Sequence, residues 1–322
     1  MSKIRAAVLR GGPSSEYEVS LRTGESILKA LPEEKYHARD VFIDKSGVWH
    51  VRGLPVEPRA VLTQSDVVVN ALHGQWGEDG KLQRFLETFG VPYTGSGPLA
   101  SAVAMHKPTA KEYARRAGIK TAAAVVVGVA HDLGKKVREL FQRLPLPAVI
   151  KPVDRGSSVG VSIARDWFEF NDGVRKAFEV SPNILIEEYI RGKEATVGVL
   201  DRFRGEDVYA FPPVEIVPPP RESFFSYNAK YGGESREICP GNFTHTEKAE
   251  LMRLARLAHE TLGLRHYSRS DFIVSPRGIY FLEANTLPGT TAESLYPKSL
   301  AAVGSGLPEF LDHVITLALE QK

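Results

Sequence analysis

Hydrophobic and polar positions alternate with two different periods over the first hundred residues, and this pattern predicts strands that alternate with helices. Apolar runs at residues 3–9, 41–43 and 67–71 have the length and β-branched content of strands. Apolar residues spaced three and four apart follow the first and third runs, as on one face of a helix. Residues 1–97 are therefore predicted to form an α/β domain with a parallel sheet and a ligand crevice at the carboxyl ends of its strands.

Glycine-rich segments follow two of these predicted strands. Gly11 and Gly12 end the first run, and the segment HGQWGEDG at residues 73–80 ends the third. Both would line the crevice if the sheet is parallel. Each segment is ambiguous by itself, because a glycine pair is typical of a plain turn and His73 in such a loop is more often structural than catalytic. The second segment also lacks the alternating Asp/Asn pattern of a calcium loop.

A Gly/Ser-rich passage at residues 94–98 is the predicted domain boundary. The pattern beyond it predicts a helix to about residue 117, a strand at 125–127, a helix near 131–144 and a strand at 148–150. The segment KPVDRGSSVGV at residues 151–161 leads from this last strand through small residues into another strand. It is interpreted as a flexible phosphate cover, since a P-loop would run from strand to helix and the Walker pattern is absent.

The C-terminal half begins with strands and a candidate lid. The pattern predicts strands at 184–186, 195–200 and 208–217, a helix from a Thr244/Glu247 capping box to residue 262, and a closing helix at 307–319. Glu187 and Tyr189 directly follow a strand and could serve an adenine pocket, although this signal alone is weak. Residues 221–242 have few aliphatic side chains and are predicted to form a long lid loop.

Residues 267–296 hold the densest group of candidate ligands. Strand-like runs at 272–274 and 279–282 flank a Ser-Pro-Arg-Gly turn, which predicts a hairpin. Antiparallel pairing would bring Asp271 near Glu283, with Asn285 two residues further on the same face. Two carboxylates and an amide oxygen are hard ligands of the kind that Mg²⁺ prefers, and Arg269 lies beside them. The alternative interpretation is a solvated polar strand face.

Composition narrows the classes of function. The 322-residue chain has 43% hydrophobic and 25% charged residues with a formal net charge of +2, as in a globular protein of two or three domains. Its basic residues are interspersed with acids, which argues against nucleic-acid and membrane partners. A single cysteine, Cys239, and the absence of a long apolar run predict a cytoplasmic protein without disulfides. No Gly-x-Ser-x-Gly hydrolase motif is present.

The order of these motifs resembles the D-alanine–D-alanine ligases of the ATP-grasp superfamily. The resemblance rests on GGPSSEYEVSL (11–21), HGQWGEDG (73–80), HK (106–107), KPVDRGSSVGVS (151–162), EEYIRGKEATV (187–197), YNAKY (227–231), SRSDF (268–272) and LEANTLPGTTAESLYP (282–297). It implies an ATP-grasp fold, α/β or α+β overall, with three domains. These would be a Rossmann-like parallel-sheet domain (1–97), a small central α+β nucleotide-cover domain (98–183) and a C-terminal α+β domain with an antiparallel sheet (184–322) and the lid loop 221–242.

The resemblance also implies roles for individual residues. The ATP-binding set would be Lys107, Lys151, Ser157, Ser158, Glu187, Glu188, Tyr189, Ile190 and Glu194. The ligands of two Mg²⁺ ions, with Mn²⁺ as an alternative metal, would be Asp271, Glu283 and Asn285. The amino-acid substrates would contact Glu16, His73, Lys230, Ser294 and Leu295. The catalytic set would be Glu16, Ser157 and Tyr231, which close the lid, with Arg269 and the Gly289 N–H as oxyanion donors.

The activity implied by the resemblance is the ATP-dependent joining of two D-alanines through an acyl phosphate, for peptidoglycan precursors, by a cytoplasmic homodimer. One alternative is a related ligase whose acceptor is D-serine or a D-hydroxy acid; Tyr231 favours an amine acceptor, because depsipeptide-forming relatives typically lack this tyrosine. A catalytically inactive nucleotide-binding protein would require the loss of a metal ligand or of Arg269, and all are present in the sequence. A kinase is a weaker alternative. Pro13, His106, Ser268 and Ser270 depart from the commonest family pattern.

Overall fold

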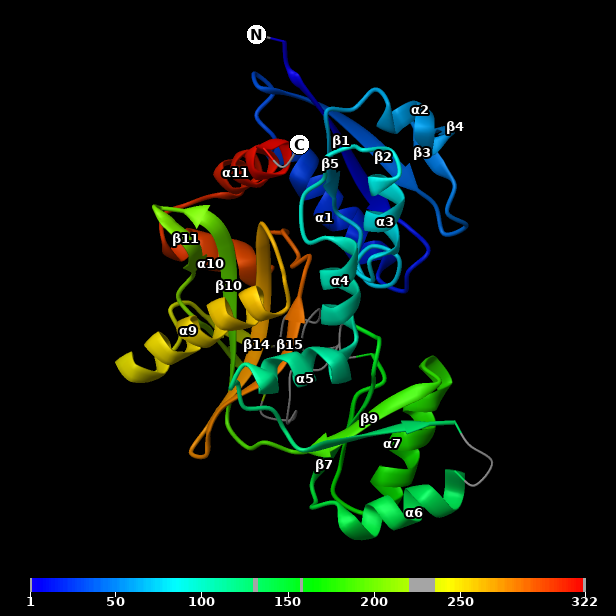
Figure 1. The fold of residues 1–322 in the computed structure, drawn as a ribbon, viewed down its shortest axis with the longest axis vertical. Helices are drawn as coiled ribbons and strands as arrows, with labels where there is room; N and C mark the ends of the chain where they lie inside the picture. The colour runs from blue at the N-terminus through cyan, green and yellow to red at the C-terminus, as the bar shows by residue number, and fades with distance from the viewer. Residues whose placement is uncertain (1, 130–132, 157–158, 220–234, 321–322) are drawn as a thin grey trace.

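The computed structural model describes residues 2–129, 133–156, 159–219 and 235–320, and it contains three β-sheets. Figure 1 shows them as successive bodies along the long axis, with the N-terminal sheet at one end, the largest sheet in the middle and the small sheet at the other end. Among the described residues, no helix has both the length and the apolar character needed to span a bilayer.

The N-terminal sheet is mixed, which corrects the prediction of a parallel sheet. Its strands, in the order β4-β3-β2-β1-β5, are β1 (Ile4–Gly11), β2 (Tyr36–Ile43), β3 (Trp49–Val51), β4 (Leu54–Val56) and β5 (Val67–Asn70). Strand β1 is parallel to β2 and β5, but β2, β3 and β4 are joined as antiparallel hairpins. The connection from β2 to β3 is too short for a helical crossover, and Asp44 Oδ1 accepts the N–H groups of Ser46 and Val48 to close it.

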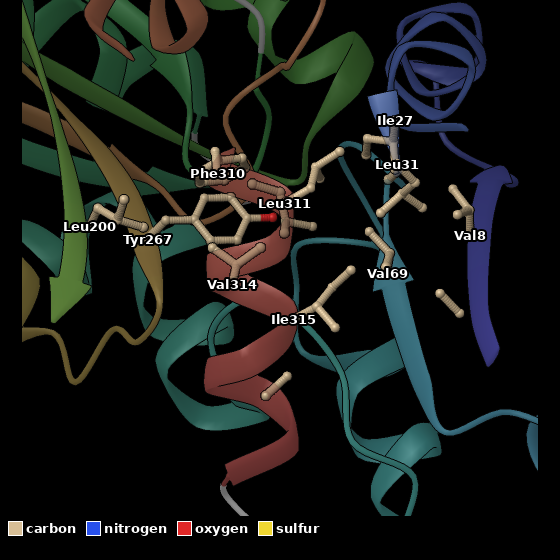
Figure 2. Packing of buried hydrophobic residues seen from close by; sticks show 14 of the residues in the cluster. Val8, Ile27, Leu31, Val69, Leu200, Tyr267, Phe310, Leu311, Val314 and Ile315 are labelled. Carbon is tan, nitrogen blue, oxygen red and sulfur yellow. The ribbon is translucent and has the colours of Figure 1, made fainter. Parts of the chain in front are cut away.

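Helices cover both faces of this sheet. They are α1 (Tyr17–Ala30), α2 (Pro58–Leu62) and α3 (Lys81–Glu87) within the N-terminal segment, and α11 (Leu307–Glu320) from the other end of the chain. The predicted inward side chains of α11 are all buried: Leu311, Val314, Ile315 and Ala318. Figure 2 shows α11 between β1 and β5 on one side and Leu200 and Tyr267 of the middle sheet on the other. One apolar core therefore joins the first and last segments of the chain.

The small sheet is antiparallel and carries two helices. Its strands, in the order β6-β9-β7-β8, are β6 (Ala124–Gly128), β7 (Ala148–Pro152), β8 (Ser162–Ala164) and β9 (Asn183–Glu188), and its helices are α6 (Leu133–Arg143) and α7 (Trp167–Val180). The sequence pattern predicted α6 but missed α7. Asp166 caps α7 by accepting the N–H of Glu169 at 2.9 Å, and Phe170 enters the core. The strand-loop-strand prediction for residues 151–161 is confirmed by the pairing of β7 with β8.

The middle sheet is also antiparallel. Its strands are β10 (Lys193–Phe203), β11 (Glu206–Ala210), β12 (Val214–Val217), β13 (Arg236–Ile238), β14 (Tyr267–Ser275) and β15 (Gly278–Asn285), and its helices are α4 (Pro98–Met105), α5 (Lys107–Arg116), α9 (His245–Thr261) and α10 (Leu295–Ala302). The single strand predicted at 208–217 is two strands, because Pro212 and Pro213 cannot donate ladder hydrogen bonds. Strand β13 lies inside the predicted loop, and the Thr244/Glu247 capping box is confirmed.

Candidate active site between the two antiparallel sheets

The predicted β14–β15 hairpin is confirmed, and a β-bulge determines which side chains it presents. Pairing runs from Ser275 opposite Gly278 to Phe272 opposite Phe281, and an unbroken register would then place Leu282 opposite Asp271. The register shifts at that point, so that Asp271 faces Glu283. The side chains of Leu282 and Glu283 consequently both line the same cavity, as bulged neighbours can.

The two carboxylates of this hairpin, those of Asp271 and Glu283, form hydrogen bonds and ion pairs with neighbouring side chains. Arg269 donates to Asp271 through Nε at 3.0 Å and through Nη2 at 3.0 Å, and Thr196 Oγ1 donates to Asp271 Oδ1 at 2.5 Å. Asn285 Nδ2 donates to Asp271 Oδ2 at 3.2 Å. The Glu283 carboxylate lies 3.0 Å from the ammonium of Lys107. The structure therefore brings all three predicted metal ligands and Arg269 together.

These oxygen ligands fit a magnesium site. The side chains of Asp271 and Glu283 are 15% and 22% exposed, so a cation from solvent can reach them. Asn285 would present its oxygen to a cation after a flip of its amide. The described part of the chain holds no group of three His, Cys, Asp or Glu side chains arranged to hold a metal ion, but the predicted set needs only two acids and one amide.

A cavity of about 320 Å³ lies between the small sheet and the middle sheet. Apolar side chains from both sheets line its inner part, among them Val149, Ile163, Ile190, Ile216, Ile273 and Leu282. Glu188, Tyr189 and Glu194 also line it, so the predicted adenine and ribose residues share one wall. Glu188 is additionally tied to the hairpin turn, where Arg277 Nη2 donates to its carboxylate at 3.1 Å. This cavity has the size and lining typical of a small-molecule site.

Cationic side chains line the same cavity as Asp271 and Glu283. Lys107 is the first residue of α5, and its Nζ donates to the carbonyl oxygen of Arg155 at 2.6 Å. Lys151 is in β7, and Arg155 follows that strand. Lys107, Lys151 and Arg155 all line the cavity. Two elements far apart in sequence thus place three cations on the cavity that the two acids of the hairpin also line, with Lys107 paired to Glu283.

The structure adds one residue that the sequence pattern missed. Lys111 on α5 is 3% exposed, and its Nζ lies 2.7 Å from Glu187 Oε2. Glu187 Oε1 forms an ion pair with Lys151, so one buried carboxylate is shared by two lysines. Burial acts to raise the pKa of Glu187, but the charges of Lys111 and Lys151 outweigh it and lower that pKa to about 2. The only sequence signal was the spacing of four residues from Lys107, which places both lysines on one helix face.

Two acidic side chains enter the site from the N-terminal sheet. Glu16 lies at the start of α1, and a Cβ atom placed on Gly156 would be 2.7 Å from its Oε1, so the glycine admits the carboxylate. Glu78 Oε2 accepts the N–H of Gly74 at 2.6 Å. Burial, with the charge of Glu16 added, raises the pKa of Glu78 to about 8. A cation placed between these two carboxylates would relieve their repulsion.

His73 is buried beside this pair. It is 5% exposed, and its Nε2 shares a hydrogen bond of 2.8 Å with Thr23 Oγ1. Burial, with a smaller contribution from the charge of Arg269, lowers the pKa of His73 to about 4. The imidazole is therefore neutral near pH 7, and it can contact a substrate through a hydrogen bond rather than through charge.

The segment that follows the hairpin contains three more predicted site residues, Gly289, Ser294 and Leu295. A Cβ on Gly289 would lie 2.9 Å from Ser294 Oγ, so these two predicted residues are neighbours. Ser294 precedes the first turn of α10 and shares a hydrogen bond of 2.8 Å with Thr291. The side chain of Leu295 is buried against Val214 and Ile216, which leaves its backbone N–H at the helix start as the group that can face an anion.

Four predicted site residues lie outside the described part of the chain: Ser157, Ser158, Lys230 and Tyr231. Most of the predicted lid loop, residues 221–234, is outside it as well. Their roles stay predictions. The described neighbours of Ser157 and Ser158 lie at the cavity, because Arg155 and Val161 both line it.

Comparison with known proteins agrees with this architecture. The family description "D-ala D-ala ligase C-terminus" matches residues 114–316, and "D-ala D-ala ligase N-terminus" matches residues 5–58 and 54–96. The D-alanine–D-alanine ligase of Syntrophobacter fumaroxidans is 39% identical over 319 residues, covering 99% of this chain and 98% of the relative. That of Pelobacter propionicus is 40% identical over 330 residues, covering 99% and 98% of the two chains.

Solved structures agree as well. The VanG D-Ala:D-Ser ligase of Enterococcus faecalis has a TM-score of 0.86 at 29% identity and covers 98% of this chain and 100% of its own. The D-alanine–D-alanine ligase of Coxiella burnetii has a TM-score of 0.84 at 26% identity, covering 100% and 95%. A mixed sheet beside two antiparallel sheets that close on one cavity defines an ATP-grasp enzyme. The chain belongs to the D-alanine–D-alanine ligase family.

Proposed function

We propose that this chain joins two D-alanine molecules at the expense of ATP, through an acyl phosphate, and releases ADP and phosphate. The observation that carries the proposal is one cavity lined by Lys107, Lys151 and Arg155 together with Asp271 and Glu283. Cations and acids on one cavity suit a metal-bound polyphosphate, and the apolar lining residues suit a base. The whole-chain relationship to D-alanine–D-alanine ligases supports the same function.

The first half of the reaction needs a charged end of the cavity. A carboxylate cannot acylate an amine at a useful rate until its oxygen becomes part of a better leaving group, which phosphorylation supplies. Lys107 and Lys151 would offset charge on the transferring phosphoryl group, and Asp271, Glu283 and Asn285 would hold the metal ions. Bound Mg²⁺, or Mn²⁺ in its place, would neutralise phosphate charge and orient the terminal phosphoryl group.

The first D-alanine would bind beside the N-terminal sheet. Its ammonium would lie between Glu16 and Glu78, where burial and the charge of Glu16 raise the pKa of Glu78 to about 8 and a bound cation would favour the ionised carboxylate. Neutral His73 would add a hydrogen bond without adding charge. This placement supports the assignment of Glu16 as the ammonium acceptor and adds Glu78 to it.

The second half of the reaction forms the peptide bond. The amine of the second D-alanine attacks the acyl phosphate, and the resulting oxyanion would be held by Arg269 and the Gly289 N–H. Ser294 and the Leu295 N–H would bind the acceptor carboxylate, with Lys230 nearby. Because an acyl phosphate hydrolyses in water, the predicted lid with Glu16, Ser157 and Tyr231 would protect it.

The decisive experiment is D-alanine-dependent phosphate release from ATP, with the product identified by mass spectrometry. We expect phosphate and D-alanyl-D-alanine in equal amounts, with no stable phosphorylated product. D-serine and D-lactate offered together with D-alanine form the specificity arms, since a structural relative is a D-Ala:D-Ser ligase. Phosphate release that ignores D-alanine, or a mixed product formed faster than the D-alanine dipeptide, would contradict the proposal.

The family resemblance also leads us to expect a cytoplasmic homodimer. Light scattering after size-exclusion chromatography should give twice the 35.5 kDa mass of one chain. A monomer at micromolar concentration would contradict the dimer without affecting the proposed chemistry.

A further inference from the structure

Lys111 is a buried cation to which the ligation chemistry above gives no task. It lies one helical turn after Lys107 on α5, and Figure 1 shows this helix beside the strands β14 and β15. Its ammonium is 2.7 Å from Glu187 Oε2, while the other oxygen of Glu187 pairs with Lys151. Helix α5, strand β9 and strand β7 each contribute one member of this trio.

The trio is enclosed and charged. Lys111, Glu187 and Lys151 are 3%, 3% and 7% exposed, so water screens their charges weakly. Lys151 and Glu187 line the cavity, and Lys111 lies behind them. With both lysines protonated and the carboxylate ionised, two positive charges and one negative charge leave the trio with a net charge of +1.

This net charge depends on Lys111. Without it, one carboxylate and one ammonium would remain, and the positive field of Lys151 toward the cavity would be largely cancelled by Glu187. Burial lowers the pKa of Lys111 to about 8, and the charge of Glu187 opposes that change. At pH 7 the Lys111 ammonium is therefore protonated in most molecules. A buried ion pair is a poor source of stability in general, because desolvation offsets the attraction. Stability therefore does not explain why a second lysine pairs with the same carboxylate.

We propose that Lys111 is a positioning residue of the polyphosphate site: it satisfies the charge of Glu187, so that Lys151 keeps its own positive charge for the phosphates. This inference rests on the proposed use of ATP in this cavity. Glu187 then orients Lys151, Lys111 balances Glu187, and Lys151 is the member of the trio that acts on the phosphates.

The proposal predicts an effect that depends on phosphate charge. Lys111→Met keeps the length of the side chain and removes its charge, so the trio falls from +1 to zero. We expect the Kd for ATP to rise about 10- to 30-fold, because one charge several ångströms away acts with this strength at a partly buried site. Adenosine has no phosphate, and its Kd should change by less than about twofold. A purely structural role for Lys111 would weaken both ligands together.

Two further variants separate charge from packing. Glu187→Gln raises the net charge to +2. Because Glu187 also belongs to the predicted ATP-binding set, its effect on the Kd for ATP is compared with its effect on the Kd for adenosine; we expect ATP to gain affinity relative to adenosine, whereas a structural role changes both equally. Lys111→Met combined with Glu187→Gln returns the net charge to +1 with no unpaired carboxylate. We expect the double variant to bind ATP about tenfold more weakly than Glu187→Gln alone, with the same Kd for adenosine in the two variants. This last comparison stands even where Lys111→Met by itself fails to fold.

The experiment is isothermal titration calorimetry of the full chain with ATP, ADP and adenosine, each with Mg²⁺ and without D-alanine. Arg116→Met is the matched control, since Arg116 lies on the same helix with its side chain 76% exposed and should leave all three Kd values unchanged. Wild-type protein that does not bind ATP would overturn the proposed function and this inference with it. Wild-type binding with equal losses for ATP and adenosine in Lys111→Met, or with no loss, would overturn this inference alone.

Discussion

The two charged walls of the cavity hold their charges in different ways. The cationic trio of Lys111, Glu187 and Lys151 is almost completely buried, and its ion pairs are formed within the trio. Asp271 and Glu283, on the hairpin opposite, are 15% and 22% exposed and are paired with single cations.

This difference follows from what each wall has to do. Buried, mutually paired charges cannot rearrange cheaply, so the trio offers the nucleotide a fixed positive site whose desolvation cost is met at folding. Partly exposed carboxylates can exchange Arg269 and Lys107 for a metal ion, since water still stabilises them during the exchange. The cationic wall is therefore preorganised, whereas the acidic wall can change its partners. Four variants test this comparison.

Arg269→Ala should have the largest effect. It removes the cation beside Asp271, which is also the proposed donor to the oxyanion, and removing one oxyanion donor typically lowers turnover about 100- to 1,000-fold. ATP affinity should change by less than about threefold, because the cationic wall is intact. Turnover is measured by phosphate release at saturating Mg²⁺, with Arg253→Ala on α9 as control. Unchanged turnover would remove Arg269 from the mechanism.

Glu283→Gln tests whether the acidic wall holds metal. It removes one of two carboxylates and releases Lys107 from its 3.0 Å ion pair. We expect the Mg²⁺ concentration for half-maximal phosphate release to rise by about 100-fold, near the upper end of changes seen at metal sites. Glu250→Gln on an exposed face of α9 is the control. An unaltered Mg²⁺ dependence would mean that Glu283 pairs with Lys107 and does not bind the metal.

His73→Gln tests whether the buried imidazole of His73 is neutral, in contrast to the buried side chains of the trio, which are charged. The pKa of His73 is lowered to about 4, against about 6.5 in the unfolded chain. Between these values the unfolded state binds more protons, so the free energy of unfolding falls as pH falls through this window.

From pH 7 to pH 5 this loss amounts to about 2 kcal/mol, which the neutral glutamine should abolish. Urea unfolding at both pH values measures it in the ligand-free protein, with exposed His37→Gln as control. Parallel losses of stability in wild type and His73→Gln would show that His73 is not held neutral.

Thr196→Val should have the smallest effect of the four. Thr196 is buried, and its hydroxyl donates to Asp271 Oδ1 at 2.5 Å. Loss of this support should weaken Mg²⁺ binding about tenfold, as for other groups that orient a metal ligand. Thr316→Val, which removes a hydroxyl donating to a carbonyl oxygen in α11, is the control. Equal Mg²⁺ dependence in both variants would mean that Arg269 and Asn285 suffice to orient Asp271.

Local sequence patterns predicted much of the fold. The spacing of apolar residues in α11 identified its buried face, and the turn residues around Pro276 identified the hairpin. The pattern did not separate β11 from β12, because the apolar run continues across Pro212 and Pro213 while the ladder cannot. It missed the mixed character of the N-terminal sheet, since strand direction depends on the length of each connection.

By itself, the sequence determined which chemical groups the protein carries and which of them are neighbours along one element. A strand presents alternate side chains and a helix presents every fourth, so Arg269 beside Asp271 and Lys107 beside Lys111 were readable from spacing. Tertiary structure decided which groups meet across elements far apart in the chain. Hairpin spacing predicted that Glu283 lies near Asp271, although it did not predict the bulge that sets them opposite each other. The contacts that join Lys111 to Lys151 through Glu187 depend on packing between segments far apart in the chain. No local pattern encodes such contacts, because they exist only once the sheets have closed on one another.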